Sequence, residues 1–453
     1  MIDFLAKQII KHPALTDLTP LPWLLSRKTK DFLTGINLWA LKQSQYWSEE
    51  NLAGLQFYRL KKTISQAYEN VPFWKKFFSR NNIKPGDIRT FDDFKKIPIT
   101  TRDTLSQAAV KELIRESVQP EDLRFRTTTS GSTGHPLEIF YDRYLVFIRE
   151  IATNAREFDF FGLNFKKFNY IFMNLPVHWR QDHGPLINLP RGLEELEKRK
   201  EEIYRTIKDN SPPILFGVTS VIVRLARLAA EDKVDLDIRG AFCRTEKLWP
   251  VDRKLIEETF HCPVSNSYGM RESKHAAHEC RYHNGFHINS EYMYVEVTDE
   301  NGRSLPDNAE GRILITVFDN KTMPFIRYDS GDLGKITREP CPCGLTLPRL
   351  FVEGRSNHFF EMPDEKKVPL KIILQKIQFT PYYLKMKQFQ FVQDKIDKIR
   401  LLIVPHKIFS KTDELGLKML IDELFGSKVK LDFEYTDKIE QKGNKITSFI
   451  KNI

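Results

Sequence analysis

Apolar residues recur at helical spacing in the first part of the chain. Phe57, Leu60, Ile64 and Ala67 fall on one helical face, and the run ends at Asn70-Val71-Pro72 because proline cannot continue a helix. We therefore expect residues 1 to about 125 to be mostly helical. The pattern changes over residues 123–142, where strand-like segments flank the polar run TTTSGSTGHP, so this part reads as strand, loop and then strand or helix start.

Further along, the pattern indicates layers of helices and strands. From residue 143 to about 270, helical stretches alternate with short apolar runs such as Tyr170–Met173 and Pro213–Phe216. Residues 290–334 alternate apolar and polar positions around an Asn301-Gly302 turn, which predicts an all-β segment. The predicted fold class is therefore α/β, with a large N-terminal lobe of layered sheets that includes a β-barrel-like part.

A smaller α/β domain is expected after a boundary near Gly354-Arg355. We place the large lobe at residues 1–354 and the small domain at residues 355–453. The elements predicted in the small domain are a helix at about 369–378, strands at 388–393 and 399–404, a helix at 412–425 and a strand at 428–434. The final residues, KGNKITSFIKN, are polar, and we expect them to be exposed.

Composition narrows the classes of function. The chain has 453 residues, 41% of them hydrophobic, and a formal net charge of +10. The positive charges are dispersed and form no basic block, which argues against a nucleic-acid partner and favours an anionic small ligand. No stretch has the roughly 18 consecutive apolar residues that a membrane span needs. The amphipathic start, residues 1–12, reads as a helix covering the lobe or, alternatively, lying on a membrane surface.

The cysteines indicate a reducing compartment. There are five, an odd number, in a chain long enough to fold without disulfides, so we expect a cytoplasmic protein. The N-terminus lacks the continuous apolar run of a signal peptide. A homodimer stays open at this point.

The loop at residues 127–136 is the strongest chemical signal. Its two glycines allow close backbone approach, and its hydroxyls and free N–H groups can donate to phosphate oxygens. The alternative is a polar linker, which rarely lies between two strand-like segments. The GxxxxGK[ST] pattern of a P-loop is absent, which argues against a P-loop kinase or GTPase.

Four further segments are weak signals when taken singly. They are Ser267–Glu272, where an aromatic and a carboxylate could serve a nucleotide and Mg²⁺; Phe325–Asp332, where Asp332 could grip ribose hydroxyls; Gly354–Asn357; and Lys445 in the tail. Their plain alternatives are a turn after a buried strand, a hairpin exit and a solvated lysine.

Taken together, these segments resemble the adenylate-forming enzymes, and most of all the phenylacetate–CoA ligase branch, whose members include proteins of capsule biosynthesis. The resemblance rests on TSGSTGHP, RYDSGD and the following Gly354-Arg355, and it covers about residues 45–450. It implies that a carboxylic acid attacks the α-phosphate of ATP, that pyrophosphate leaves, and that the acyl-adenylate passes to coenzyme A after a hinge rotation of the small domain.

The resemblance also implies roles for individual residues. ATP and AMP would be bound by Thr129, Ser130, Gly131, Ser132, Thr133, Gly134, Thr245, Glu246, Ser267, Tyr268, Gly269, Met270, Asp332 and Arg355. Tyr268 would stack on adenine and Asp332 would bind the ribose. Glu272 would hold Mg²⁺, Lys445 would bridge the carboxylate and the α-phosphate, and Asn357 would be the hinge.

Several positions depart from the family pattern. His135 stands where the loop often has Lys, Arg271 where Thr or Ser is usual, and Asn357 where the hinge is Asp or Lys. A glycine expected after the hinge is missing from Pro363–Lys366, and Lys442 competes with Lys445. These changes leave the acceptor open between coenzyme A and an amine or hydroxyl. A non-catalytic nucleotide-binding regulator is the alternative from another class.

A structural zinc site is a further expectation. Cys341 and Cys343 could join Cys280 and His287, with His283 as an alternative ligand, in a closed tetrahedral site. The alternative is two exposed thiols and a buried Cys280.

The acid is expected near the Tyr268 segment. Its candidate lining is Val177-His178-Trp179, Phe216-Gly217-Val218 and Tyr141, which suits an aryl or other small acid, although the same side chains could be ordinary core.

Overall fold

In the computed structural model, the chain divides into two compact units. One comprises Met1–Leu248 and Leu255–Val352, and the other Trp249–Lys254 and Glu353–Ile453. The described residues are 27–118, 123, 125–128, 137–164, 170–173, 187–189, 193–406, 409–426, 429–439 and 448–453. Among these residues, none of the helices combines the length and the apolar character needed to cross a bilayer.

The first described part of the N-terminal unit is helical, as expected. It contains α2 (Arg27–Ser44), α3 (Glu49–Asn70), α4 (Pro72–Arg80), α5 (Phe91–Lys95), α6 (Arg102–Ser106) and α7 (Val110–Leu113). Helix α3 begins at the Ser48 cap, whose side chain accepts the Asn51 N–H, and ends at Asn70 because Pro72 starts the next helix. Leu60, Ile64 and Ala67 on its apolar face are buried, which confirms the predicted periodicity.

One long sheet forms the centre of this unit. Its eleven strands within the described residues run in the order β10-β11-β12-β13-β9-β8-β7-β6-β5-β3-β4. The strands are β3 (Tyr170–Met173), β4 (Ile187–Leu189), β5 (Ile214–Val218), β6 (Gly240–Arg244), β7 (Val264–Met270), β8 (Lys274–His278), β9 (Phe286–Ile288), β10 (Met293–Thr298), β11 (Gly311–Val317), β12 (Tyr328–Thr337) and β13 (Arg349–Arg355).

The sheet has a parallel half and an antiparallel half that meet at β7. Strands β3 to β7 pair in parallel, and β7–β8, β8–β9, β9–β13, β10–β11 and β11–β12 pair antiparallel. The segment expected to be barrel-like thus continues the parallel layer within the same sheet. A strand at such a junction is suited to carry a site, because ligands of open α/β sheets bind beyond the carboxyl ends of the parallel strands.

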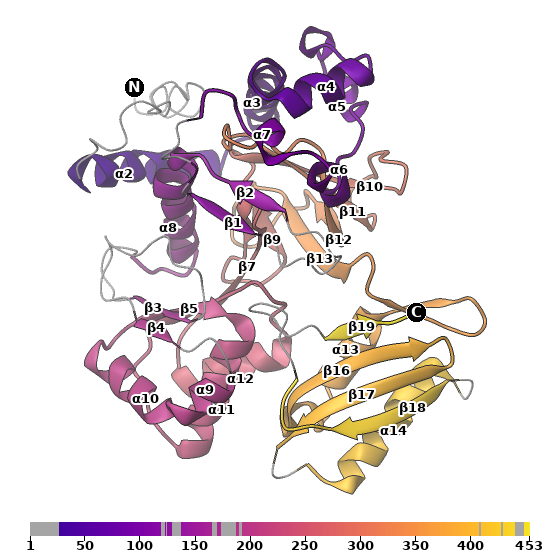
Figure 1. The fold of residues 1–453 in the computed structure, drawn as a ribbon. Helices are drawn as coiled ribbons and strands as arrows, with labels where there is room; N and C mark the ends of the chain where they lie inside the picture. The colour runs from indigo at the N-terminus through magenta and orange to yellow at the C-terminus, as the bar shows by residue number, and fades with distance from the viewer. Residues whose placement is uncertain are drawn as a thin grey trace. The chain divides into compact units, whose positions relative to one another are not determined.

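Helices cover the parallel half, as a buried parallel sheet requires. Figure 1 shows α9 (Leu193–Lys198), α10 (Lys200–Asp209), α11 (Thr219–Asp232) and α12 (Pro250–Phe260) gathered near β3, β4 and β5. Helix α8 (Glu150–Phe160) packs Phe158 against Phe216 of β5 and Phe242 of β6, with ring centroids 6.5 and 4.1 Å apart. It follows a π-helical turn at Leu145–Arg149.

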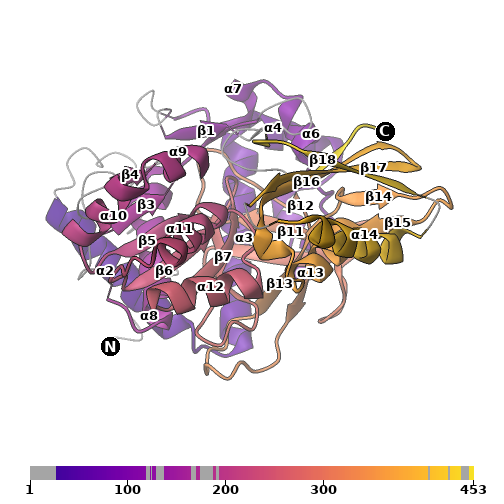
Figure 2. The same cartoon turned by 90° about the horizontal axis from the view of Figure 1, so that it is seen from below.

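The C-terminal unit is a small α/β layer. Its elements are β14 (Phe359–Glu361), β15 (Lys367–Pro369), α13 (Leu370–Gln378), β16 (Met386–Lys395), β17 (Lys398–Pro405), α14 (Lys411–Phe425), β18 (Lys430–Tyr435) and β19 (Phe449–Lys451). Strands β18-β17-β16-β19 form its main sheet, and Figure 2 shows α13 and α14 on one side of these strands. The two helices and the sheet share one apolar core.

The end of the chain differs from the prediction. The final residues were expected to be polar and exposed, yet Phe449–Lys451 form β19, which pairs in parallel with β16. Phe449 is buried against Phe360, with ring centroids 4.6 Å apart. One aromatic residue in a polar tail is enough to anchor a three-residue edge strand when a neighbouring core can receive it.

Candidate functional site

Strand β7 and the turn after it hold the central motif. The strand is buried from Val264 to Tyr268 and becomes more accessible at Gly269 and Met270. A side chain at Gly269 would bring its Cβ to 2.2 Å from the Lys274 carbonyl oxygen, so only glycine fits where β7 turns back into β8. The hairpin therefore fixes the positions of Tyr268 and Glu272 on either side of this tight crossing.

Tyr268 and Asp332 meet across the sheet. The Tyr268 hydroxyl donates a hydrogen bond to Asp332 Oδ2 at 2.8 Å, and both residues are buried. The Asp332 backbone N–H donates to Ser330 Oγ at 3.0 Å, which holds the β12 segment in place. The residues expected at the adenine and the ribose are thus brought together although 64 positions separate them.

A second tyrosine–carboxylate pair lies on the same two segments. The Tyr328 hydroxyl donates to Glu272 Oε1 at 2.8 Å. Burial, together with the nearby Glu272 carboxylate, raises the pKa of Tyr328 well above its usual value, so the phenol stays protonated and can only keep donating. The Tyr328 hydroxyl thus fixes the orientation of the Glu272 side chain, whose oxygens are of the kind that Mg²⁺ favours.

The segment after β6 is fixed by the start of α11. Thr245 has a φ of +71°, an unusual backbone conformation for a β-branched residue. The next side chain, Glu246, accepts the Ser220 N–H at 2.9 Å, and the Thr219 hydroxyl donates to the Glu246 carbonyl at 3.1 Å. Glu246 thus caps the start of α11. The predicted contact of Thr245 and Glu246 with a nucleotide stays a prediction.

Strands β1 (Arg126–Thr128) and β2 (Glu138–Phe140) bracket the glycine-rich loop as an antiparallel pair. The loop residues Thr129, Ser130, Gly131, Ser132, Thr133, Gly134 and His135 lie outside the described residues. Arg271, unusual for the family, donates from Nη1 to Thr127 Oγ1 at 3.2 Å. Tyr141, just after β2, donates its hydroxyl to the Arg271 carbonyl at 2.8 Å. The turn with Glu272 is thereby tied to both ends of the loop.

The remaining predicted nucleotide and hinge residues belong to the C-terminal unit. Arg355 and Asn357 are exposed, and a turn forms between them, in which the His358 N–H donates to the Arg355 carbonyl at 3.2 Å. Glu365, in the segment where a glycine was expected, takes a φ of +63°, in the left-handed region that favours glycine. Lys442 and Lys445 lie outside the described residues.

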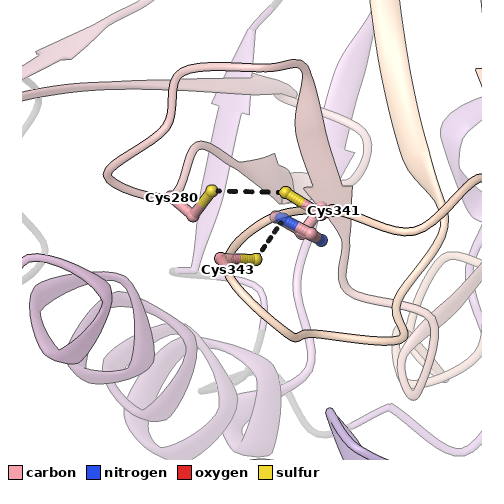
Figure 3. A group of neighbouring side chains, drawn as sticks. Cys280, Cys341 and Cys343 are labelled. Carbon is pink, nitrogen blue, oxygen red and sulfur yellow. Dashed lines mark hydrogen bonds between the residues drawn. The ribbon is translucent and has the colours of Figure 1, made fainter.

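Four candidate metal ligands converge at the β8–β9 side of the sheet. The ligand atoms of Cys280, His287, Cys341 and Cys343 all lie within 4.8 Å of one another. The sulfurs of Cys280 and Cys341 are 3.8 Å apart, and Cys343 Sγ is 3.3 Å from His287 Nε2. Figure 3 shows the three thiols pointing into one small space. A tetrahedral zinc ion with Zn–S bonds of about 2.3 Å separates its sulfur ligands by about 3.8 Å, so the arrangement fits zinc.

The surroundings settle which histidine belongs to this group. His287 Nδ1 donates to the Leu347 carbonyl at 3.2 Å, which leaves Nε2 facing Cys343. His283, the alternative ligand, instead has Nδ1 3.2 Å from Glu279 Oε2. Cys341 and Cys343 are joined by a turn in which the Gly344 N–H donates to the Cys341 carbonyl, with Gly344 at φ +82°. The same turn brings both thiols to one side.

The expected acid lining is only partly described. Val177, His178 and Trp179 lie outside the described residues, and Phe216 and Tyr141 are buried. Beside them lies a charged cluster that the sequence analysis missed, consisting of Arg149, Glu150, Arg244, Lys274 and His275. A signal was present: Arg-Glu occurs at 149–150 and again at 156–157, two helical turns apart, which places both pairs on one face of the helix.

The comparisons agree with this fold and these motifs. Residues 363–453 match the family model of the CapK C-terminal domain. The chain is 24% identical over 395 residues to a phenylacetate–coenzyme A ligase of Thermus thermophilus, covering 83% of this chain and 86% of that protein. It is 24% identical over 422 residues to the protein CapK of Staphylococcus aureus, covering 89% and 90%.

Among solved structures, a 2-hydroxyisobutyryl-CoA ligase in complex with 2-HIB-AMP superimposes with a TM-score of 0.75 at 18% identity, covering 90% of this chain and 91% of that one. This likeness confirms the layered α/β fold. The chain is therefore similar over most of its length to phenylacetate–coenzyme A ligases and to CapK, and its C-terminal residues match the CapK C-terminal domain.

Proposed function

We propose that the protein activates a small carboxylic acid with ATP and passes the acyl group to coenzyme A. The observation that carries this proposal is the pair of contacts that joins β7 to β12, Tyr268 to Asp332 and Tyr328 to Glu272, each 2.8 Å long. They bring the Tyr268 ring and the carboxylates of Asp332 and Glu272 to one strand end, which supports a site for a nucleotide and its metal ion there. The curated relatives from Thermus thermophilus and Aromatoleum evansii are phenylacetate–coenzyme A ligases, which supports this activity.

In the first step, a carboxylate oxygen of the acid bonds to the α-phosphorus of ATP, and the bond from that phosphorus to pyrophosphate breaks. Asp332 would accept hydrogen bonds from the ribose, and Tyr268 would stack on the adenine. Glu272 would hold Mg²⁺, which neutralises charge on the triphosphate. Lys445 would stabilise the α-phosphate as its charge builds. No covalent bond to the protein is needed, since positioning and charge stabilisation suffice.

In the second step, the thiol of coenzyme A attacks the acyl carbon and AMP leaves. We place the hinge for this change at Asn357 and take residues 355–453 as the moving domain. Arg355 would lie beside the nucleotide. The exposure of Arg355 and Asn357 supports a hinge there, because hinges are often a few residues in loops or at the ends of elements.

A second acceptor deserves a direct test. Residues 363–453 match the CapK C-terminal domain, and the hinge position holds Asn357 instead of Asp or Lys. This is the part of the chain that would serve the second step, so an amine or hydroxyl acceptor is the other candidate. Incubation of the acyl-adenylate with coenzyme A, and separately with amines and sugars, distinguishes the two by the product that forms.

Acid-dependent exchange of labelled pyrophosphate into ATP tests the first step. We expect exchange with at least one acid of a broad panel in the absence of any acceptor. Lys445→Ala should lower it by about 100-fold or more, as loss of a group that stabilises transition-state charge does, and Lys442→Ala is the matched control. No exchange with any acid would leave a nucleotide-binding regulator as the better reading, and loss in Lys442→Ala alone would move the role to Lys442.

We also propose that Cys280, His287, Cys341 and Cys343 hold a structural zinc ion. The fit of the sulfur spacing supports zinc as a clamp between the β8–β9 segment and the turn at residues 341–344. Protein purified without chelator should contain about one zinc per chain, and Cys343→Ser should lose it. A zinc content below about a tenth of an equivalent contradicts the proposal. Because none of the five cysteines forms a disulfide, we further propose the cytoplasm as the compartment.

A further inference from the structure

The two faces of β7 carry different chemistry. Successive side chains of a strand point to opposite faces, so Ser267 points away from the face on which Tyr268 meets Asp332. Ser265, on the same face as Ser267, donates its hydroxyl to Glu157 of α8 at 2.6 Å. Ser267 therefore faces the α8 side of the sheet, while the proposed nucleotide residues Tyr268 and Asp332 lie on the other side.

Two neighbouring parallel strands end on this same face. Phe216 of β5 pairs with Phe242 of β6, and Arg244 lies two residues further along β6, so all three share a face. The Arg244 guanidinium lies 4.3 Å from the Phe216 ring centre. The His275 ring centre is 6.5 Å from that of Phe216. Together with Ser267, these side chains gather at the carboxyl ends of β5, β6 and β7, the edge at which open α/β sheets bind ligands.

Helix α8 and strand β8 add an ion pair to this group. Glu150 Oε2 is 3.7 Å from Lys274 Nζ, and Glu150 Oε1 is 3.8 Å from His275 Nε2. Lys274 Nζ also lies 4.0 Å above the Tyr141 ring. Burial lowers the pKa of both Lys274 and His275, and His275 is therefore neutral at pH 7. The Glu150 charge is balanced by Lys274, so the group does not call for a second cation.

Polar atoms of this group lack the partners that buried polar atoms normally have. Ser267 Oγ, Glu150 Oε2 and Arg244 Nε have no hydrogen-bond partner, and their residues are only 8%, 7% and 4% exposed. Within the part of the chain that the structure describes, Ser267 is the only serine and Glu150 the only glutamate with such an atom. Leaving a buried polar group unsatisfied costs about 1–3 kcal/mol. Ser267 Oγ has no partner, and Glu150 Oε2 has only the 3.7 Å ion pair with Lys274. These two oxygens, together with the nearby Phe216 and Tyr141 rings, point to a ligand that supplies the missing hydrogen bonds.

We propose that the acid activated by this protein carries a neutral hydrogen-bond donor, a hydroxyl or an arylamine, besides its carboxylate. This inference rests on the proposed acid-activating function. The donor gives its hydrogen to Glu150 Oε2, and Ser267 bonds the same substituent. The apolar part of the acid packs against Phe216 and Tyr141. Glu150 and Ser267 are thus specificity-determining residues, and plain alkyl or aryl acids leave their oxygens unsatisfied.

Matched acids in the pyrophosphate-exchange assay test this inference. The pairs are benzoate against hydroxybenzoates and aminobenzoates, and propionate against lactate and alanine. We expect kcat/KM for the best hydroxyl or arylamine acid to exceed that of its unsubstituted partner by about 100-fold, as sites built to hydrogen-bond a substrate discriminate strongly. Alanine, whose ammonium would lie beside Lys274, should be a poor substrate.

Variants assign the preference to residues. Glu150→Gln and Ser267→Ala should each reduce the ratio of substituted to unsubstituted kcat/KM by about tenfold. Glu112→Gln, at a surface pair with Lys76, is the matched control and should leave the ratio unchanged. The ratio measured on the unaltered protein stands even where a variant fails to fold.

The outcomes separate the two hypotheses. Exchange with unsubstituted acids within about threefold of their hydroxyl or amino partners overturns this inference and leaves the proposed function standing. Preference for the ammonium acid overturns the neutral-donor assignment. Absence of exchange with every acid overturns the proposed function and this inference with it.

Discussion

The two units of the chain treat charged side chains in opposite ways. In the N-terminal unit, arginines and glutamates lie in the interior, among them Arg149, Arg156, Glu157, Glu291 and Arg327. Between Glu353 and Ile453, the described residues include one buried charged side chain, Asp413. Its carboxylate caps α14 through Ser410 and pairs with Lys385 at 2.7 Å. In the Trp249–Lys254 segment of the same unit, Asp252 is also buried and accepts the Tyr383 hydroxyl at 2.7 Å, and the rest of the described core between Glu353 and Ile453 is mainly apolar.

This difference bears on where function lies. A buried ion pair adds little net stability, yet it fixes side chains in one arrangement and is costly to break. Arg156 lies 2.8 Å from Glu291, and Ser265 and His278 both contact Glu157, so β7, β8 and the segment before β10 are tied to α8 by polar contacts. The unit that would orient ATP and the acid is therefore the one with a specified polar interior. The C-terminal unit, to which we assign the hinge and Lys445, has an apolar interior instead.

The largest expected effect is loss of one buried charge in the N-terminal unit. Arg327 is buried and lies 3.2 Å from Glu296, and it donates to the carbonyls of Ile97 and Gly302 at 2.5 and 2.8 Å. Arg327→Met should lower the free energy of unfolding by about 3–5 kcal/mol, because Glu296 would stay buried without its partner. Urea unfolding followed by tryptophan fluorescence measures this, since Trp74 is buried in the same unit.

A matched surface pair sets the scale for that experiment. Lys76 and Glu112 lie 2.8 Å apart at the surface, and Lys76→Ala should change stability by less than about 0.5 kcal/mol. The double variant Glu296→Leu/Arg327→Met should recover part of the loss, because no charge is then left unpaired. Equal effects of Arg327→Met and Lys76→Ala would remove the contrast between the buried and exposed pairs.

The next effect concerns the core of the C-terminal unit. Phe449→Ala should destabilise this unit by about 3 kcal/mol, because a buried ring packed against Phe360 would leave a cavity. Hydrogen exchange of the β16 amides reports it directly. Ile453→Ala, at an exposed position, is the control and should leave exchange unchanged. Protection of β16 that is unaltered in Phe449→Ala would mean that β19 adds nothing to the core.

The same contrast explains what the sequence could and could not reveal. Helix α14 was predicted within a residue, because Leu417, Leu420, Ile421 and Leu424 lie on one helical face, and the structure adds a Ser410–Asp413 capping box at its start. Strand β19 was not predicted, because three residues beside a polar run carry no periodic signal and are held only by β16 from far along the chain. Local pattern determines elements whose stability is local.

In the N-terminal unit, the sequence revealed the motif residues but not the side chains that hold them in position. Tyr268, Glu272 and Asp332 stand out by their motifs, whereas the partners Tyr328, Arg271 and Thr127 are identified only by contacts between distant segments. The convergence of Cys280, His287, Cys341 and Cys343 was expected from their chemistry. The charged face of α8 was missed because helical charges are ordinarily solvated, and burial depends on partners such as Arg244 and Glu291 in other elements.

A smaller effect is expected when one support of the site is removed. Tyr268→Phe keeps the ring and deletes the hydroxyl that donates to Asp332. The KM for ATP in pyrophosphate exchange should rise about five- to tenfold with little change in kcat, because one net hydrogen bond contributes about 1 kcal/mol. Tyr328→Phe should act instead through Glu272 and shift the Mg²⁺ dependence. If both variants raise the KM for ATP equally and neither alters the Mg²⁺ dependence, the division of roles between the two pairs is wrong.

The smallest effect is a pH dependence confined to the C-terminal unit. Burial, together with the nearby Arg355 charge, lowers the pKa of His358 to about 4, and its ring packs against Phe449. In the unfolded chain the pKa is near 6.5, so the unfolded state binds the proton first as pH falls. The stability contributed by neutral His358 is therefore complete above about pH 6.5 and is lost progressively toward pH 4.

Because His358 is partly accessible to solvent, we expect a loss of about 1 kcal/mol between pH 7 and pH 5. Hydrogen exchange of the β16 amides, compared at these two pH values after correction for the intrinsic rate, measures it. His358→Gln removes the titrating group, so its stability should vary less over this range. If His358→Gln loses as much stability between pH 7 and pH 5 as the unaltered protein, another group causes the pH dependence. In that case, charging His358 does not destabilise the apolar core around Phe449.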